Sequence, residues 1–111
     1  MHRKPTETEL ELIKYLVNKA GSHSCHIDWD SMQVASMNDG GMGSLKLYPS
    51  GNVCDTDNRT FGSELADCSF DDEDGTKVIA TIYLDKSDGL FELDMWKVDY
   101  SALLRIPKSF E

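Results

Sequence analysis

Apolar and polar residues alternate most clearly in two runs, residues 77–84 and residues 90–96. An alternation with a period of two is typical of a strand that buries one face. Residues 85–89 separate the two runs with the turn-forming sequence Asp-Lys-Ser-Asp-Gly. The pattern therefore predicts a hairpin, and the rest of the chain can be placed around it.

The register of this hairpin follows from the same pattern. We expect Leu84 to pair with Gly89, which leaves a four-residue loop from Asp85 to Asp88. A shift by one residue would place apolar residues opposite Glu92, so the pattern favours the first register. The apolar pairs that this register predicts are Ile82 with Phe91, Ala80 with Leu93, and Val78 with Met95.

A second hairpin is predicted immediately before the first. Residues 72–76 suit a three-residue loop with Gly75 in the left-handed conformation. The three strands would then share one apolar face, through the pairs Phe70 with Val78, Cys68 with Ala80, and Ala66 with Ile82. The opposite face would be acidic and partly aromatic, with Asp67, Ser69, Ile79, Thr81, Tyr83, Glu92, Asp94 and Trp96.

The N-terminal part of the chain predicts a helix over residues 7–20. Thr6 and Glu9 have the spacing of a capping box, and Gly21 is a natural C-cap. An apolar stripe at helical spacing runs along the segment, through Leu10, Leu12, Ile13, Leu16, Val17 and Ala20. A single sheet needs a cover for its apolar face, so we expect this stripe to pack there.

The remaining elements complete an α+β prediction. Residues 31–37 and 43–48 alternate as strands around the turn sequence of residues 38–41, and residues 98–104 favour a helical turn. We therefore expect one domain over residues 1–111. In it, the N-terminal helix packs on one face of an antiparallel sheet of about five strands in meander order.

Charge restricts the class of partner. The chain carries a net charge of −9, with fourteen acids against six bases in residues 51–111. Phosphate backbones and anionic lipids repel such a domain, so we expect neither nucleic-acid nor membrane binding. A basic protein is the favoured partner, and solubility is the alternative reason for the acidity. The N-terminus lacks the apolar segment of a secretory signal, which favours a cytoplasmic protein.

Three segments invite a metal or phosphate site, and we expect none of them to be one. His23, Cys25 and His26 lie close together but lack zinc-finger spacing and a second ligand pair. Residues 55–60 resemble a calcium loop but carry Arg59 and Thr60 where a ligand and a glycine are needed. Residues 40–43 are glycine-rich but lack the Lys-Ser/Thr ending of a phosphate loop. We also expect three free cysteines and no cofactor.

Catalysis is not favoured by any residue pattern. Cys25 beside two histidines lacks an orienting acid, and we assign no catalytic residue. In the predicted register Asp67, Thr81 and Glu92 form one row, which places the two carboxylates roughly 9–10 Å apart. An open sheet offers no cleft that would raise a carboxyl pKa or exclude water there.

The acidic face is better suited to docking a protein. Trp96 and Tyr83 are the residue types that anchor protein interfaces. The alternative is that Trp96 is buried beneath the C-terminal segment and the acids only solvate the sheet. The predicted partner-binding residues are Asp67, Thr81, Tyr83, Glu92, Asp94 and Trp96 on this face, and Asp71, Asp72 and Asp74 at the hairpin tip.

Two segments, residues 38–45 (NDGGMGSL) and residues 90–104 (LFELDMWKVDYSALL), resemble a family of small bacterial cytoplasmic proteins with no assigned function. The resemblance extends to Phe61, Gly62 and residues 72–75. It implies a shared fold and supplies no catalytic residue. Small acidic domains of this kind are similar to immunity proteins, which mask a toxin, as in contact-dependent growth inhibition.

We therefore expect a non-enzymatic immunity protein, a monomer or weak dimer, that neutralises a cognate basic toxin of the nuclease type. The alternative is an adaptor or regulatory module that binds another protein, and a small hydrolase is the third hypothesis. Protection from a toxin without turnover would distinguish the first from the other two.

Overall fold

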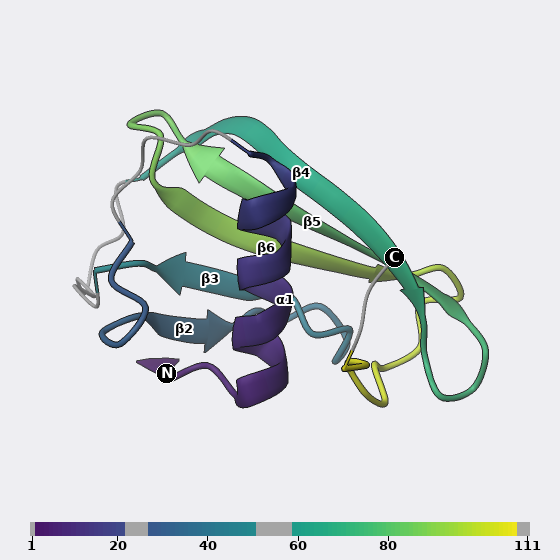
Figure 1. Ribbon diagram of the computed structural model, residues 1–111. Coiled ribbons are helices and arrows are strands. Elements are labelled where there is room, and N and C mark those ends of the chain that lie inside the picture. Colours follow the sequence, from purple (N-terminus) through teal and green to yellow (C-terminus); the bar gives the residue numbers. More distant parts are fainter. Residues whose placement is uncertain (1, 22–26, 51–58, 109–111) are drawn as a thin grey trace.

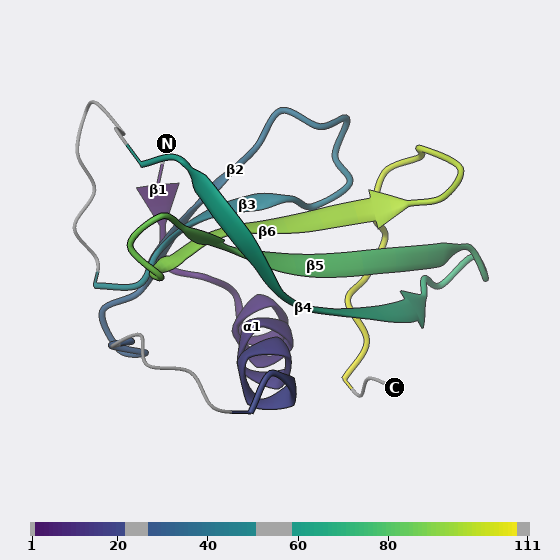
Figure 2. The ribbon, with the colours of Figure 1, turned by 90° about the horizontal axis from the view of Figure 1, so that it is seen from above.

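The fold is a six-stranded antiparallel sheet with one helix, as seen in a computed structural model that describes residues 2–21, 27–50 and 59–108. The elements in chain order are β1 (His2–Arg3), α1 (Glu7–Lys19), β2 (Gln33–Ser36), β3 (Leu45–Tyr48), β4 (Phe61–Asp71), β5 (Lys77–Asp85) and β6 (Leu90–Lys97). Helix α1 lies across one face of the sheet, and none of the described residues form a helix on the opposite face (Figures 1 and 2). The predicted α+β class, with the helix on one face of an antiparallel sheet, is confirmed.

The order of the strands differs from the predicted meander. The sheet runs β1-β2-β3-β6-β5-β4, so two three-stranded meanders meet where β3 pairs with β6. The short strand β1, which was not predicted, forms one edge, and the long strand β4 forms the other. Alternation reports which face of a strand is buried but not which strand is its neighbour, so it could not reveal this order.

Helix α1 begins as its capping residues predict. The Thr6 hydroxyl accepts the Glu9 N–H at 3.2 Å, and the Glu9 carboxylate accepts the Thr6 N–H at 2.8 Å. The predicted stripe faces the sheet, because Leu12, Ile13 and Leu16 are fully buried. These side chains and the apolar face of β2–β6 form the core.

The β4–β5 hairpin has the predicted register. Gly75 has a φ of +81°, the left-handed conformation that a three-residue loop requires there. The strand pairs match the prediction in full: Phe70 with Val78, Cys68 with Ala80, and Ala66 with Ile82.

The β5–β6 hairpin is shifted by two residues from the predicted register. Its pairs are Ile82 with Leu93, Ala80 with Met95, and Val78 with Lys97. Leu84 pairs with Leu90, and a bulge follows at Phe91. A shift by two residues keeps every side chain of the regular part on its predicted face, so the pattern could not exclude it.

The bulge removes Phe91 from the core facing α1, where it was expected. Its ring lies 5.2 Å from the Arg59 guanidinium carbon, which also lies 4.7 Å from the ring of Tyr48. The same guanidinium donates to the carbonyl oxygens of Leu47 and Leu90. Phe91 is buried, but by Arg59 and not by the helix.

Residues 98–108 form a turn followed by a segment without regular secondary structure, where a helical turn was predicted. The Tyr100 N–H donates to the Lys97 carbonyl at 2.8 Å, and Tyr100 has a φ of +64°, so the chain turns sharply after β6. The segment then crosses to the side of the sheet that carries α1 (Figure 2). There Leu103 packs against the core and Ile106 joins it.

Candidate protein-binding face

The face of the sheet opposite α1, here called the open face, carries the predicted docking residues. The side chains that it presents from four strands include Lys46, Glu64, Asp67, Ser69, Asp71, Lys77, Ile79, Thr81, Tyr83, Glu92, Asp94 and Trp96. Their neighbours along each strand point into the core, which fixes the side on which these residues lie.

The rows across this face differ from the predicted ones. Asp67, Thr81 and Asp94 form one row, whereas Glu92 was expected in the third position. Glu92 instead lies beside Tyr83, with Lys46 on its other side. The two-residue shift of β6 is the reason. Thr81 is buried between its neighbours, so its side chain adds little to the surface.

The carboxylates of the open face influence one another. Partial burial raises the pKa of Asp94, and the negative charge of Asp39 raises it further against a hydrogen bond from Ser44. Burial together with the neighbouring Asp67 likewise raises the pKa of Glu64. Burial is the larger cause of both shifts, and the part that comes from neighbouring carboxylates indicates negative potential at these two groups.

The pKa of Tyr83, at the centre of the face, is affected by the same negative potential. Desolvation raises the pKa of its hydroxyl, and the charges of Asp94, Glu64 and Glu92 raise it further. Four groups from three strands thus share one electrostatic environment. A cationic partner would relieve this repulsion on binding.

Exposed aromatic rings border the acidic rows. The Trp96 side chain is 39% exposed, so it is not buried beneath the C-terminal segment. Its ring centroid lies 6.2 Å from that of Tyr100, which is 69% exposed. Phe61, also exposed, packs edge-on against Tyr83 at 5.3 Å.

The predicted partner-binding acids at the β4–β5 hairpin tip differ in their exposure to solvent. Asp71 is exposed and the Asp74 side chain is 40% exposed. Asp72, which we also predicted to bind a partner, is only 4% exposed and points inward, so its side chain is not available to a partner.

Asp72 instead holds the C-terminal segment. Its carboxylate accepts the backbone N–H groups of Leu104 at 2.8 Å and Arg105 at 2.9 Å, and Lys97 lies 2.9 Å from it. Lys97 also donates to Asp74 at 2.8 Å. Burial works to raise the pKa of Asp72, but these hydrogen bonds outweigh it and lower that pKa to about 2. We call Asp72, Asp74 and Lys97 the C-terminal clasp.

The glycine-rich turn of residues 38–45 packs against the same segment. The Leu103 N–H donates to the Gly41 carbonyl at 3.0 Å. A Cβ atom at Gly43 would lie 2.9 Å from a methyl carbon of Leu103. The segments on which the family resemblance rests therefore contact one another around residues 102–105, where they stabilise the fold.

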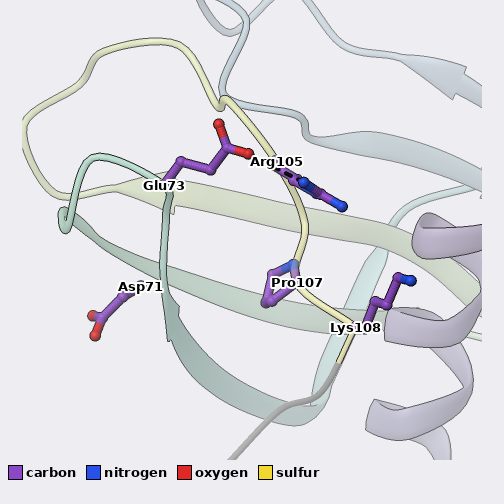
Figure 3. Close-up of a pocket in the computed structure, with 5 residues that line it drawn as sticks. All are labelled: Asp71, Glu73, Arg105, Pro107 and Lys108. Carbon is purple, nitrogen blue, oxygen red and sulfur yellow. Dashed lines mark hydrogen bonds and ion pairs between the residues drawn. The ribbon is translucent and has the colours of Figure 1, made fainter.

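A hollow lies between the β4–β5 hairpin and the C-terminal segment (Figure 3), and its volume is about 270 Å³. It is lined by Asp71, Glu73, Arg105, Pro107 and Lys108. The Glu73 carboxylate and the Arg105 guanidinium point toward each other at 3.4 Å. Acidic and basic groups balance here, so the hollow has no strong preference for either sign of charge.

A second hollow of about 360 Å³ lies on the outer edge of the sheet. Lys19, Asp67, Cys68, Ser69, Lys77 and Ile79 line it. Cys68 is free and buried, and burial raises the pKa of its thiol. The two hollows flank the last part of strand β4.

Several sequence hypotheses fall on residues that the structure does not describe. These residues are His23, Cys25, His26, Cys54, Asp55, Asp57 and Asn58. Within the described ranges, no group of three or more His, Cys, Asp or Glu side chains is arranged to hold a metal ion. No helix in that part of the chain is long and apolar enough to span a membrane.

A family model matches residues 2–107 of the chain. The chain belongs to the family described as Domain of unknown function (DUF6984). No curated protein and no solved structure matches it. The family supplies no activity to carry over, so the function must be argued from the open face.

Proposed function

We propose that this member of the family is a non-enzymatic immunity protein that binds a basic toxin through the open face. The observation that supports it is the combination of mutually repelling carboxylates and exposed aromatic rings on a sheet face that no helix covers. The toxin's cationic active surface would be masked in the cytoplasm of the protected cell.

The charge of the face suits a cationic partner. Glu64 and Asp67 lie on β4 and Asp94 lies on β6, with β5 between the two strands. Lys46 on β3 and Lys77 on β5 are basic residues of the same face. Electrostatic attraction mainly speeds the encounter of two proteins, while buried aromatic side chains slow their separation. The proposal therefore predicts that Glu92 and Asp94 raise the association rate and that Trp96 lowers the dissociation rate.

Catalysis on this face is disfavoured by its shape. Asp67 and Asp94 stand on either side of Thr81, two strands apart, and both are exposed. A carboxylate pair that works as acid and base needs a site that excludes water. Asp67 lines a hollow at the edge of the sheet, but Asp94 is not among the residues that line it.

The proposal is tested by co-expressing each variant with a candidate basic toxin and measuring cell survival and binding kinetics. The variant Glu92→Lys/Asp94→Lys should associate about tenfold more slowly at low salt. Trp96→Ala should dissociate about tenfold faster or more. Added salt should slow association of the native chain.

A matched control carries the same change in charge away from the open face. Glu11 and Asp30 are exposed, and Glu11 lies on the outer side of α1. The variant Glu11→Lys/Asp30→Lys should protect cells as the native chain does. Full protection by a folded Glu92→Lys/Asp94→Lys/Trp96→Ala variant would place the interface elsewhere. Binding of a host protein without protection would favour the adaptor alternative.

A further inference from the structure

Strand β4 leaves part of its backbone open at the edge of the sheet. Asp72 and Thr76 are hydrogen-bonded in the hairpin, and the antiparallel ladder alternates from there. Phe70 and Cys68 therefore direct their backbone groups toward β5. Asp67, Ser69 and Asp71 direct theirs outward.

The outward groups are only partly satisfied. The Lys19 ammonium donates to the Asp67 carbonyl at 2.6 Å. The backbone N–H and C=O groups of Ser69 and Asp71 have no hydrogen-bond partner among the described residues. An exposed edge of this kind is a template for an added strand.

The two halves of β4 differ in this respect. Irregular pairing occurs between Phe61 and Ser63 and again between Glu64 and Ala66. Such bulges twist an edge and prevent further pairing. From Ala66 to Asp71 the register is regular, so only this second half can extend the sheet.

We propose that residues 67–71 of β4 accept an extended basic segment of the partner as a seventh, antiparallel strand. This inference rests on the proposed function, and it specifies how the basic partner docks. The side chains of Asp67 and Asp71 lie on the open face and would stand beside alternate residues of the added strand. Those residues would be lysine or arginine, and the residues between them would be apolar and lie near Phe70.

A second copy of this chain is a poorer occupant. Antiparallel pairing of two β4 edges centred on Ser69 would place Asp67 of each copy opposite Asp71 of the other. Like charges in directly opposed positions destabilise a sheet. The hollows on both sides of the edge, with volumes of about 360 and 270 Å³, leave room for side chains of a different sequence.

The test uses the full chain and a capped synthetic peptide of alternating lysine and valine residues as the probe. At saturation, the Ser69 and Asp71 amide protons should exchange with solvent about tenfold more slowly or more, because they become hydrogen-bonded. Ser69→Pro removes one outward donor and should weaken peptide binding about tenfold. Proline is tolerated on a free edge, and the matched variant Ser69→Ala keeps the N–H and should bind within about twofold.

Lys19 provides a second variant that does not alter the strand. Its ammonium occupies the Asp67 carbonyl and repels a basic strand. Lys19→Met should therefore bind the peptide about two- to fivefold more tightly. Weaker binding by this variant, or equal binding by Ser69→Pro and Ser69→Ala, would overturn the proposal, as would no binding at millimolar peptide.

The outcomes separate this inference from the proposed function. Peptide binding could change the NMR signal of the Trp96 side chain and leave amide exchange at Ser69 and Asp71 unchanged. That result would overturn the proposed added strand but not the proposed binding through the open face. Alternatively, amide exchange at Ser69 and Asp71 could slow while cells with the Glu92→Lys/Asp94→Lys/Trp96→Ala variant survive fully. That result would support the added strand and contradict toxin binding through the open face. Dimerisation of the free chain through β4 would contradict the proposal that a basic segment of the partner occupies this edge.

Discussion

At the scale of single residues, the acids of the hairpin tip differ in burial, and the sequence pattern predicts part of that difference. Asp71, Asp72 and Asp74 look equivalent in a polar turn, yet only Asp72 is buried. Its position continues the alternation of Cys68 and Phe70, so the pattern already assigned it to the core face. Lys97 continues the alternation of Leu93 and Met95 in the same way. An acid and a base that end two apolar series on the same face of one sheet indicate an ion pair, and the sequence prediction did not use that signal.

We predict that Asp72→Asn lowers the free energy of unfolding by about 3 kcal/mol, because it leaves the buried Lys97 ammonium without its full partner. Chemical denaturation near neutral pH measures this loss. Asp71→Asn, one residue away and exposed, should change the value by less than about 0.5 kcal/mol. Equal effects of the two substitutions would show that the clasp does not stabilise the fold.

The clasp also predicts a dependence on pH. The pKa of Asp72 is about 2 in the folded chain and lies below its ordinary value of 3.8. Stability from the ionised carboxylate is therefore complete above pH 3.8 and is lost as pH falls toward 2. The difference in unfolding free energy between the native chain and Asp72→Asn should shrink over this range. A difference that stays constant with pH would contradict this assignment.

At the scale of elements, prediction succeeded where a single local signal was sufficient. The capping residues defined the start of α1, and Gly75 defined the β4–β5 hairpin. The β5–β6 hairpin was wrong by two residues because Asp88 adopts a positive φ and Phe91 forms a bulge. Both registers bury the same faces, so alternation alone does not distinguish them. The helical turn predicted at residues 98–104 was wrong because the backbone N–H groups of Leu103 and Leu104 bond to Gly41 and Asp72.

The contact between the glycine-rich turn and residues 102–103 gives a testable packing prediction. Gly43→Ala should destabilise the chain by about 1–3 kcal/mol, because the new methyl group would overlap Leu103. Gly40→Ala is the matched control, since Gly40 also has a positive φ but faces open space. Thermal or chemical unfolding should give a larger loss at position 43. Equal losses would indicate backbone strain alone.

At the scale of the whole molecule, the strand order sets which surface is available. The pairing of β6 with β5 places Asp94 beside Thr81 and Glu92 beside Tyr83, while α1 and the C-terminal segment both cover the opposite face (Figure 2). Composition predicted an acidic domain but not that Glu64, Glu92 and Asp94 would surround one tyrosine. That arrangement depends on the irregular pairing within β4 and on the two-residue shift of β6, which alternation does not encode.

The crowding of like charges predicts a conflict between stability and binding. Asp94 has a raised pKa because it is partly desolvated and lies near Asp39, so its ionised form is unfavourable in the folded chain. Asp94→Asn should therefore stabilise the fold near neutral pH, by less than about 1 kcal/mol because solvent screens the exposed charge. This gain should diminish as salt rises from about 0.02 to about 0.2 M, where the repulsion is already screened.

The same substitution should slow association with the basic partner. A folded chain that gains stability and loses association rate on one substitution carries its charge for binding and not for stability. Denaturation at the two salt concentrations and association kinetics on one preparation measure both effects. The Glu11→Gln variant removes a negative charge from the outer side of α1 and should change neither. If Asp94→Asn leaves the association rate unaltered while stabilising the chain, the acidity of the open face does not guide the partner, and solubility becomes the better account of the net charge of −9.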